Sequence, residues 1–75
     1  MLTDIAARQA KAKELPYKIS DSGGLYLLVK STGKYWRMNY RFAGKQKTLA
    51  IGVYPTISLT HARKKRDEAR ALLAK

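Results

Sequence analysis

Cysteine is absent from the sequence, histidine occurs once, and only five of the 75 residues are acidic. Without cysteine the chain can form neither disulfides nor thiolate zinc sites, so a small apolar core has to hold the fold together. The longest apolar run, residues 25–29, is too short to cross a bilayer, and no signal-peptide pattern opens the chain. We therefore expect one cytoplasmic domain over residues 1–75, without a metal, a cofactor or a membrane partner.

The scarcity of acidic groups also argues against an enzyme. Acid–base catalysis needs paired titratable groups in a cleft, whereas the five acids fall in the terminal thirds of the chain. His61 lies among basic residues at the start of a predicted helix, where a solvated side chain is a more common role than catalysis or metal binding. No combination of residues predicts a catalytic site.

Basic residues, by contrast, are abundant. Sixteen Lys and Arg give a net charge of +11, and residues 22–66 contain ten basic residues and no acidic one. A surface of one sign repels itself and usually exists to bind a polyanion. Nucleic acid is the first candidate. An anionic membrane is the weaker one, because no bulky apolar residue follows the basic tract at residues 63–66 until Leu72.

Alternation of apolar and polar side chains predicts a strand over residues 35–42. Its even positions, from Trp36 to Phe42, are apolar or aromatic, and its odd positions include Arg37 and Arg41. A turn at residues 43–44 would join it to a strand over residues 45–51. The resulting pairs are Met38 with Leu49, Trp36 with Ile51, Arg37 with Ala50, Asn39 with Thr48, and Arg41 with Gln46.

The remaining segments predict an α+β fold. Residues 25–29 read as a strand, residues 17–20 as extended, and residues 52–55 as a break in the sheet. A short N-terminal helix begins at Thr3 or Asp4, and a C-terminal helix begins at Ser58. We expect a three-stranded antiparallel sheet, with or without one further short strand, whose apolar face packs against both helices. The stripe of Leu59, Ala62, Ala69 and Leu72 or Leu73 should cover that face, with Trp36 and Tyr40 in the core.

The polar face of the predicted hairpin is the strongest functional signal. A small sheet fits the major groove of DNA, where Arg can form paired hydrogen bonds with guanine, and Asn or Gln with adenine. An ordinary solvated face is the alternative, and the missing acids favour DNA because solvated faces usually mix charges. The residues predicted to contact bases are Arg37, Asn39, Arg41, Gln46, Thr48 and an exposed Tyr26.

Phosphate contacts are predicted around this face, where they would position the protein without reading sequence. They come from residues near strand ends and from the C-terminal basic tract, namely Lys30, Lys34, Tyr35, Lys45, Lys47, Arg63 and Lys64. Two alternatives stay open. The basic C-terminal helix could dock on an acidic protein partner, or the chain could bind nucleic acid, single strands included, without sequence preference.

An ordered series of segments resembles the N-terminal arm-type DNA-binding domain of phage and genomic-island integrases, in the tyrosine recombinase family. The series covers nearly the whole chain and is more specific than any one of its segments. It consists of Leu2-Thr3-Asp4, YKISDSGGLYLLV at residues 17–29, GKYWR at residues 33–37, Gly44-Lys45, LAIGVYP at residues 49–55, Ser58-Leu59 and Ala62-Arg63.

This resemblance implies binding of double-stranded DNA at arm-type sites, which flank a core recombination site, through a three-stranded sheet in the major groove. It also implies that the chain is part of a longer integrase, which acts with other integrase subunits at the bacterial nucleoid in DNA integration and recombination. The family's catalytic Arg, His and nucleophilic Tyr belong to a separate domain. None of the five tyrosines of this sequence is therefore expected to be a nucleophile.

Overall fold

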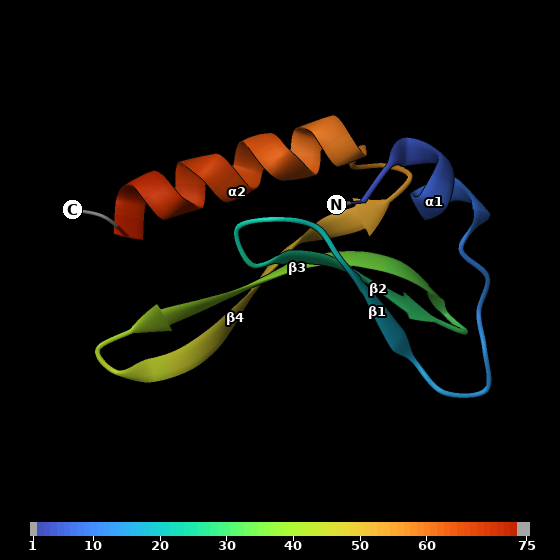
Figure 1. The fold of residues 1–75 in the computed structure, drawn as a ribbon, viewed down its shortest axis with the longest axis horizontal. Helices are drawn as coiled ribbons and strands as arrows, with labels where there is room; N and C mark the ends of the chain where they lie inside the picture. Colours follow the sequence, from blue (N-terminus) through green and yellow to red (C-terminus); the bar gives the residue numbers. More distant parts are fainter. Residues whose placement is uncertain (1, 74–75) are drawn as a thin grey trace.

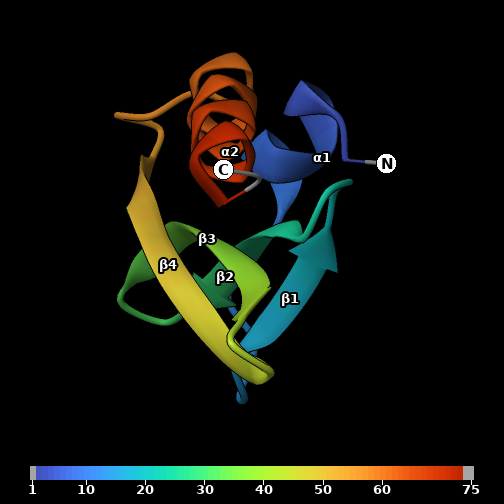
Figure 2. The same cartoon turned by 90° about the vertical axis from the view of Figure 1, so that its left-hand side faces the viewer.

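The computed structural model describes residues 2–73. The elements in chain order are α1 (Asp4–Gln9), β1 (Tyr17–Ser20), β2 (Leu25–Lys30), β3 (Gly33–Phe42), β4 (Lys45–Tyr54) and α2 (Leu59–Leu73). The strands form one antiparallel sheet in the order β1-β2-β3-β4, and both helices lie on the same side of it (Figures 1 and 2). The predicted α+β fold is confirmed, and the further short strand is present as β1.

The core lies between the helices and alternate residues of β2 and β3. Leu25, Leu27, Val29 and Trp36 are almost fully buried there, together with Leu59 and Ala62 of α2 and Ala7 of α1. Burying a side chain of this size stabilises the fold by about 1.5–3 kcal/mol. The indole Nε1 of Trp36 also donates a hydrogen bond of 2.6 Å to the carbonyl of Ile57, which fixes the segment before α2 to the sheet.

Both predicted helix starts are confirmed by their caps. The hydroxyl of Thr3 accepts a hydrogen bond of 3.1 Å from the backbone N–H of Ala6, and the hydroxyl of Ser58 accepts one of 3.2 Å from that of His61. Each cap satisfies a backbone donor that has no partner inside its helix. Both helices therefore begin where the sequence predicts.

The register between β3 and β4 agrees with the prediction over the distal part of the hairpin and departs from it near the core. Met38 pairs with Leu49 as expected, but Trp36 pairs with Gly52 and not with Ile51, because a β-bulge lies between Trp36 and Arg37 in this register. Ile57 packs directly on the α-carbon of Gly52, where no side chain would fit. The expectation that the sheet breaks after Ile51 is also wrong, since β4 continues to Tyr54.

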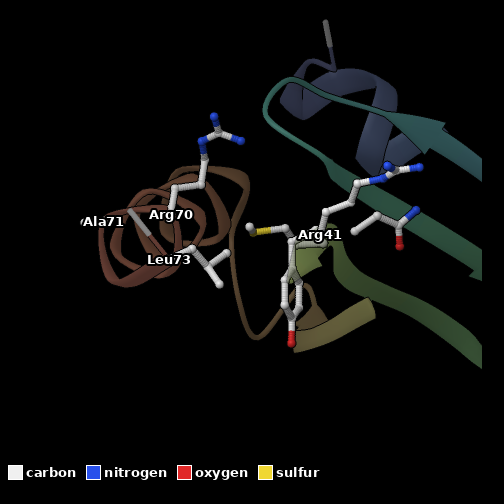
Figure 3. Close-up of a pocket in the computed structure, with 7 residues that line it drawn as sticks. Arg41, Arg70, Ala71 and Leu73 are labelled. Carbon is white, nitrogen blue, oxygen red and sulfur yellow. The ribbon is translucent and has the colours of Figure 1, made fainter. Parts of the chain in front are cut away.

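The β3–β4 hairpin extends beyond the rest of the sheet. Because β2 begins at Leu25, opposite Met38, residues 39–48 form a two-stranded projection that we call the ribbon (Figure 1). A cleft of about 510 Å³ separates the ribbon from the last turns of α2, and Arg41 and Leu73 are among its lining residues (Figure 3). The ribbon is therefore supported by its own pairing more than by the helix.

The predicted apolar stripe of α2 covers the sheet only in part. Leu59 and Ala62 are buried, whereas Leu72 is 70% exposed. Leu73, the alternative member of the stripe, is 37% exposed and lines the cleft. Tyr40, expected in the core, is half-buried beside the cleft. The reason is that the twisted ribbon leaves the C-terminal half of the helix without a surface to pack against.

Candidate nucleic-acid interface

The side of the sheet away from the helices, which we call the open face, is formed by the side chains that alternate with the core residues. The strand register places residues from all four strands on it. They are Lys18 and Ser20 of β1, Tyr26, Leu28 and Lys30 of β2, Tyr35, Arg37, Asn39 and Arg41 of β3, and Gln46, Thr48, Ala50 and Val53 of β4.

The charge of the open face has a single sign. Within residues 2–73, none of the four strands contains Asp or Glu, and the cations on this face are Lys18, Lys30, Arg37 and Arg41. No carboxylate on the sheet therefore competes with an incoming phosphate for these groups. A surface of this kind attracts nucleic acid over distances of about 10 Å at moderate salt.

Tyr26 and Leu28 form an apolar floor near the middle of the open face. Tyr26 is only 7% exposed, so the expectation of an exposed Tyr26 is wrong. The reason is that long neighbouring side chains cover the ring: the ammonium group of Lys18 lies 4.9 Å from its centroid. The face of an aromatic ring attracts an ammonium group, so this contact holds the charge of Lys18 at a defined place on the open face.

Lys18 and Ser20 are members of the open face that the sequence analysis did not single out. The sequence does carry a signal for them, because apolar and polar side chains alternate over residues 17–20 and both Lys18 and Ser20 are at the polar positions. Their assignment required knowing that this segment pairs with β2, where Ser20 lies opposite Tyr26.

The predicted base-contacting residues gather on the ribbon and at its root. Arg37 and Asn39 are half-buried, and Arg41, Gln46 and Thr48 are exposed. The pairs Asn39–Thr48 and Arg41–Gln46 are direct cross-strand neighbours, as predicted. The Thr48 hydroxyl donates a hydrogen bond of 3.0 Å to Oδ1 of Asn39. These side chains form a compact set of donors and acceptors on one face.

The predicted phosphate contacts are placed less uniformly. Lys30 and Tyr35 lie on the open face, with the ammonium group of Lys30 5.7 Å from the centroid of the Tyr35 ring. Lys45 and Lys47 are exposed near the end of the ribbon. By strand alternation they lie on the face that carries the core residues, opposite the open face. Lys64 is exposed on α2. Of the predicted phosphate contacts on the sheet, only Lys30 and Tyr35 thus share the open face with the base-contacting set.

Lys34 is on the helix side of the sheet. Its ammonium group donates hydrogen bonds of 2.8 Å and 3.1 Å to the carbonyls of Ala7 and Arg8, at the end of α1. It also lies 5.4 Å from the centroid of the Tyr54 ring. A cation at a helix C-terminus stabilises the unpaired carbonyls there, so these contacts give Lys34 a structural role.

Arg63 is likewise engaged inside the protein. Its guanidinium group binds both carboxylate oxygens of Asp21 at 2.9 Å and donates to the carbonyl of Leu2 at 2.8 Å. Arg66 adds a contact of 3.2 Å to the same carboxylate. The hydrogen bond from Arg63 holds the pKa of Asp21 below its ordinary value of 3.8 and raises the pKa of Arg63. Two charges of the basic tract are therefore committed to this ion pair.

The described residues show neither a metal centre nor a membrane segment. Across residues 2–73, no three His, Cys, Asp or Glu side chains come together in a way that would hold a metal ion. In the same part of the chain, no helix has both the length and the apolar character needed to cross a membrane.

A basic, acid-free sheet face backed by helices is typical of a small nucleic-acid-binding domain. Comparison with known proteins identifies the family of this chain. The model of the family described as "Arm DNA-binding domain" matches residues 2–75. The chain belongs to this family, and it is accordingly a DNA-binding domain.

Several curated relatives are integrases. The integrase of Enterobacteria phage P4 is 55% identical over 67 residues, which are 85% of this chain and 15% of that protein. The prophage integrase IntA of Escherichia coli strain K12 is 47% identical over 77 residues, covering 99% of this chain and 19% of the relative. The integrase of Shigella phage Sf6 is 45% identical over 71 residues, with coverage of 93% and 18%. The chain thus spans less than a fifth of the length of each relative.

Proposed function

We propose that this domain binds arm-type sites in double-stranded DNA by placing the open face of β2, β3 and β4 in the major groove. The observation that carries the proposal is the set of Arg37, Asn39, Arg41, Gln46 and Thr48 on paired strands of an acid-free sheet. These are the side-chain types that hydrogen-bond to base edges, and they occupy one face at alternate positions.

The width of the sheet suits this mode of binding. Neighbouring strands lie about 4.8 Å apart, so the backbones of three strands span about 10 Å. The major groove is about 12 Å wide and admits a β-ribbon. Because residues 39–48 project beyond β2, Asn39 and Arg41 can enter the groove while Lys18 and Lys30 remain near its phosphate walls.

Selection of bound duplexes from a random pool tests the proposal directly. We expect a motif of a few base pairs to be enriched. Arg37→Ala and Arg41→Ala should each weaken binding to the selected duplex by about 1–3 kcal/mol and relax the preference at one position. Dissociation constants for selected and scrambled duplexes, measured at one salt concentration, give both quantities.

Arg8→Ala is the matched control, because it removes one arginine charge from α1, on the opposite side of the sheet. It should leave the selected motif unchanged. If no motif is enriched, or if Arg37→Ala weakens selected and scrambled duplexes equally, base reading by the sheet is contradicted.

The alternative of a protein-binding basic helix is less well supported. Arg63 and Arg66, at the ends of its basic tract, are bound to Asp21 and turned toward the β1–β2 turn. A partner would have to compete with an ion pair that already exists. Equal affinity for duplex DNA and for heparin would nevertheless favour this alternative, or non-specific binding, over the sheet.

We further propose that the domain serves a tyrosine recombinase of the integrase type in DNA integration and recombination. Family membership and the names of the relatives support this proposal. In that setting the domain would work in the bacterial cytoplasm, at the nucleoid, beside other integrase subunits. The bond-breaking chemistry would belong to another domain of the complete protein.

A further inference from the structure

One cross-strand hydrogen bond on the ribbon determines how an amide group faces outward. Asn39 of β3 and Thr48 of β4 are directly paired, and the Thr48 hydroxyl donates to Oδ1 of Asn39 at 3.0 Å. Both residues lie on the open face, where Thr48 is exposed and Asn39 is half-buried. The contact is therefore part of the surface that would meet DNA.

This hydrogen bond fixes which atoms of the amide remain available. Oδ1 is turned toward β4 and keeps one lone pair, while the Nδ2 group keeps both of its hydrogens. The free edge of the amide thus offers one acceptor and one donor side by side. Adenine presents the complementary pattern in the major groove, with N6–H as donor and N7 as acceptor, whereas guanine presents two acceptors.

The Asn39 backbone is also held in place. Its N–H donates a hydrogen bond of 2.9 Å to the carbonyl of Gly24, and the α-carbon of Gly24 lies directly against the Asn39 carbonyl. The side chain therefore starts from a fixed backbone, and its amide plane is set by Thr48. Little conformational freedom remains to be lost when a base binds, which favours a specific contact.

We propose that Thr48 is a positioning residue that orients Asn39 to read an adenine in the target DNA. The proposal rests on the proposed function and deepens it, because it names one base and separates two roles within the predicted base-contacting set. Thr48 commits its single proton to Asn39, and its contribution to specificity passes through that side chain.

Base-by-base substitution of the selected duplex, combined with three variants, tests the proposal. In the wild-type protein, substituting one particular A·T pair should reduce affinity about tenfold. Asn39→Ala should lose this preference for that pair and keep the preferences at the other pairs. Thr48→Val should lose about threefold to tenfold at the same pair, because valine keeps the shape and strand propensity of threonine but lacks the hydroxyl. Thr48→Ser, which retains the hydroxyl, should keep the preference. Replacing that adenine by 7-deazaadenine removes N7 and should reduce wild-type binding to the level of Asn39→Ala.

A double variant separates positioning from direct contact. Once Asn39 is alanine, adding Thr48→Val should cause no further loss if Thr48 acts through Asn39. A further loss, a loss at a different base pair, or a preference of Asn39 for guanine would overturn the proposal. Failure of the proposed function has a different signature, since then no base pair would be preferred by the wild-type protein. Circular dichroism of each variant verifies that the fold is kept.

Discussion

The carboxylate of Asp21 connects three parts of the chain that are far apart in sequence. It accepts hydrogen bonds from the backbone N–H of Leu2 and from the guanidinium groups of Arg63 and Arg66, and its side chain is fully buried. The N-terminal segment, the β1–β2 turn and α2 meet at this one group. In a small core with few large side chains, such a contact is a considerable part of the net stability.

Asp21→Asn should lower the free energy of unfolding at pH 7 by about 2 kcal/mol, because it leaves two arginines facing an uncharged amide. Since the pKa of Asp21 is lowered in the folded state, its contribution is present above the ordinary value of 3.8 and is lost as the pH falls further. Urea unfolding should therefore show the two proteins converging in acid. Asp67→Asn, at a carboxylate that is 66% exposed, should change little at any pH.

At Gly24 both the backbone conformation and the close packing require a residue without a side chain. Its φ of +85° favours glycine, and a β-carbon there would collide with the carbonyl of Asn39. Gly24→Ala should cost about 2 kcal/mol or more, whereas Gly44→Ala, with a φ of +78° but open space around it, should cost about 1 kcal/mol. Thermal unfolding of the two variants measures the difference. Equal costs would mean that the Gly24–Asn39 contact carries no constraint.

At the scale of elements, the hairpin was the most predictable part of the fold. Alternation in β3 specified which face Trp36 and Arg37 occupy, and the two-residue turn then specified the pairs Asn39–Thr48 and Arg41–Gln46. The bulge escaped prediction because a glycine such as Gly52 can signal the end of a strand as well as a bulge within it. Ile57 favours the bulge, since it packs on Gly52 after the chain has turned back toward the sheet.

The candidate site could be predicted only where it lies within one hairpin. The roles of Lys34 and Arg63 depend on contacts with α1 and with Asp21, 26 to 42 residues away in sequence. The sequence around a basic side chain does not indicate such a distant partner. Lys34 and Arg63 are therefore predicted as phosphate contacts in the same way as Lys30. The burial of Tyr26 likewise depends on Lys18, in a neighbouring strand.

The core part of β3 and its end in the ribbon should respond differently to substitution. Trp36→Phe removes the hydrogen bond to Ile57 and part of a fully buried ring, so we expect a loss of about 2–3 kcal/mol in stability. Phe42 is 55% exposed at the tip of the ribbon, and Phe42→Ala should cost less than about 1 kcal/mol. Urea unfolding measures both losses in the free energy of unfolding, from the shift of each midpoint when the dependence on urea concentration is unchanged. A large loss from Phe42→Ala would show that the ribbon is held by more than its own pairing.

For the molecule as a whole, charge should govern affinity. If about five phosphates are contacted, the logarithm of the binding constant should fall with the logarithm of salt concentration at a slope of about −4 to −5. Lys18→Ala and Lys30→Ala should each reduce the slope by about 1 without changing the selected motif. Arg8→Ala should leave the slope unchanged. Titrations at four salt concentrations provide the measurement, and an unchanged slope for both lysine variants would remove β1 and β2 from the phosphate contacts.

The projection of residues 39–48 beyond β2 has a consequence for how target preference can change. Asn39, Arg41, Gln46 and Thr48 lie outside the core cluster, so exchanging them leaves the packing around Trp36 intact. If these residues read DNA as proposed, folding and recognition depend on largely separate sets of residues. A library randomised at these four positions should yield mostly folded proteins with new DNA preferences, which makes the ribbon a suitable place to redesign recognition.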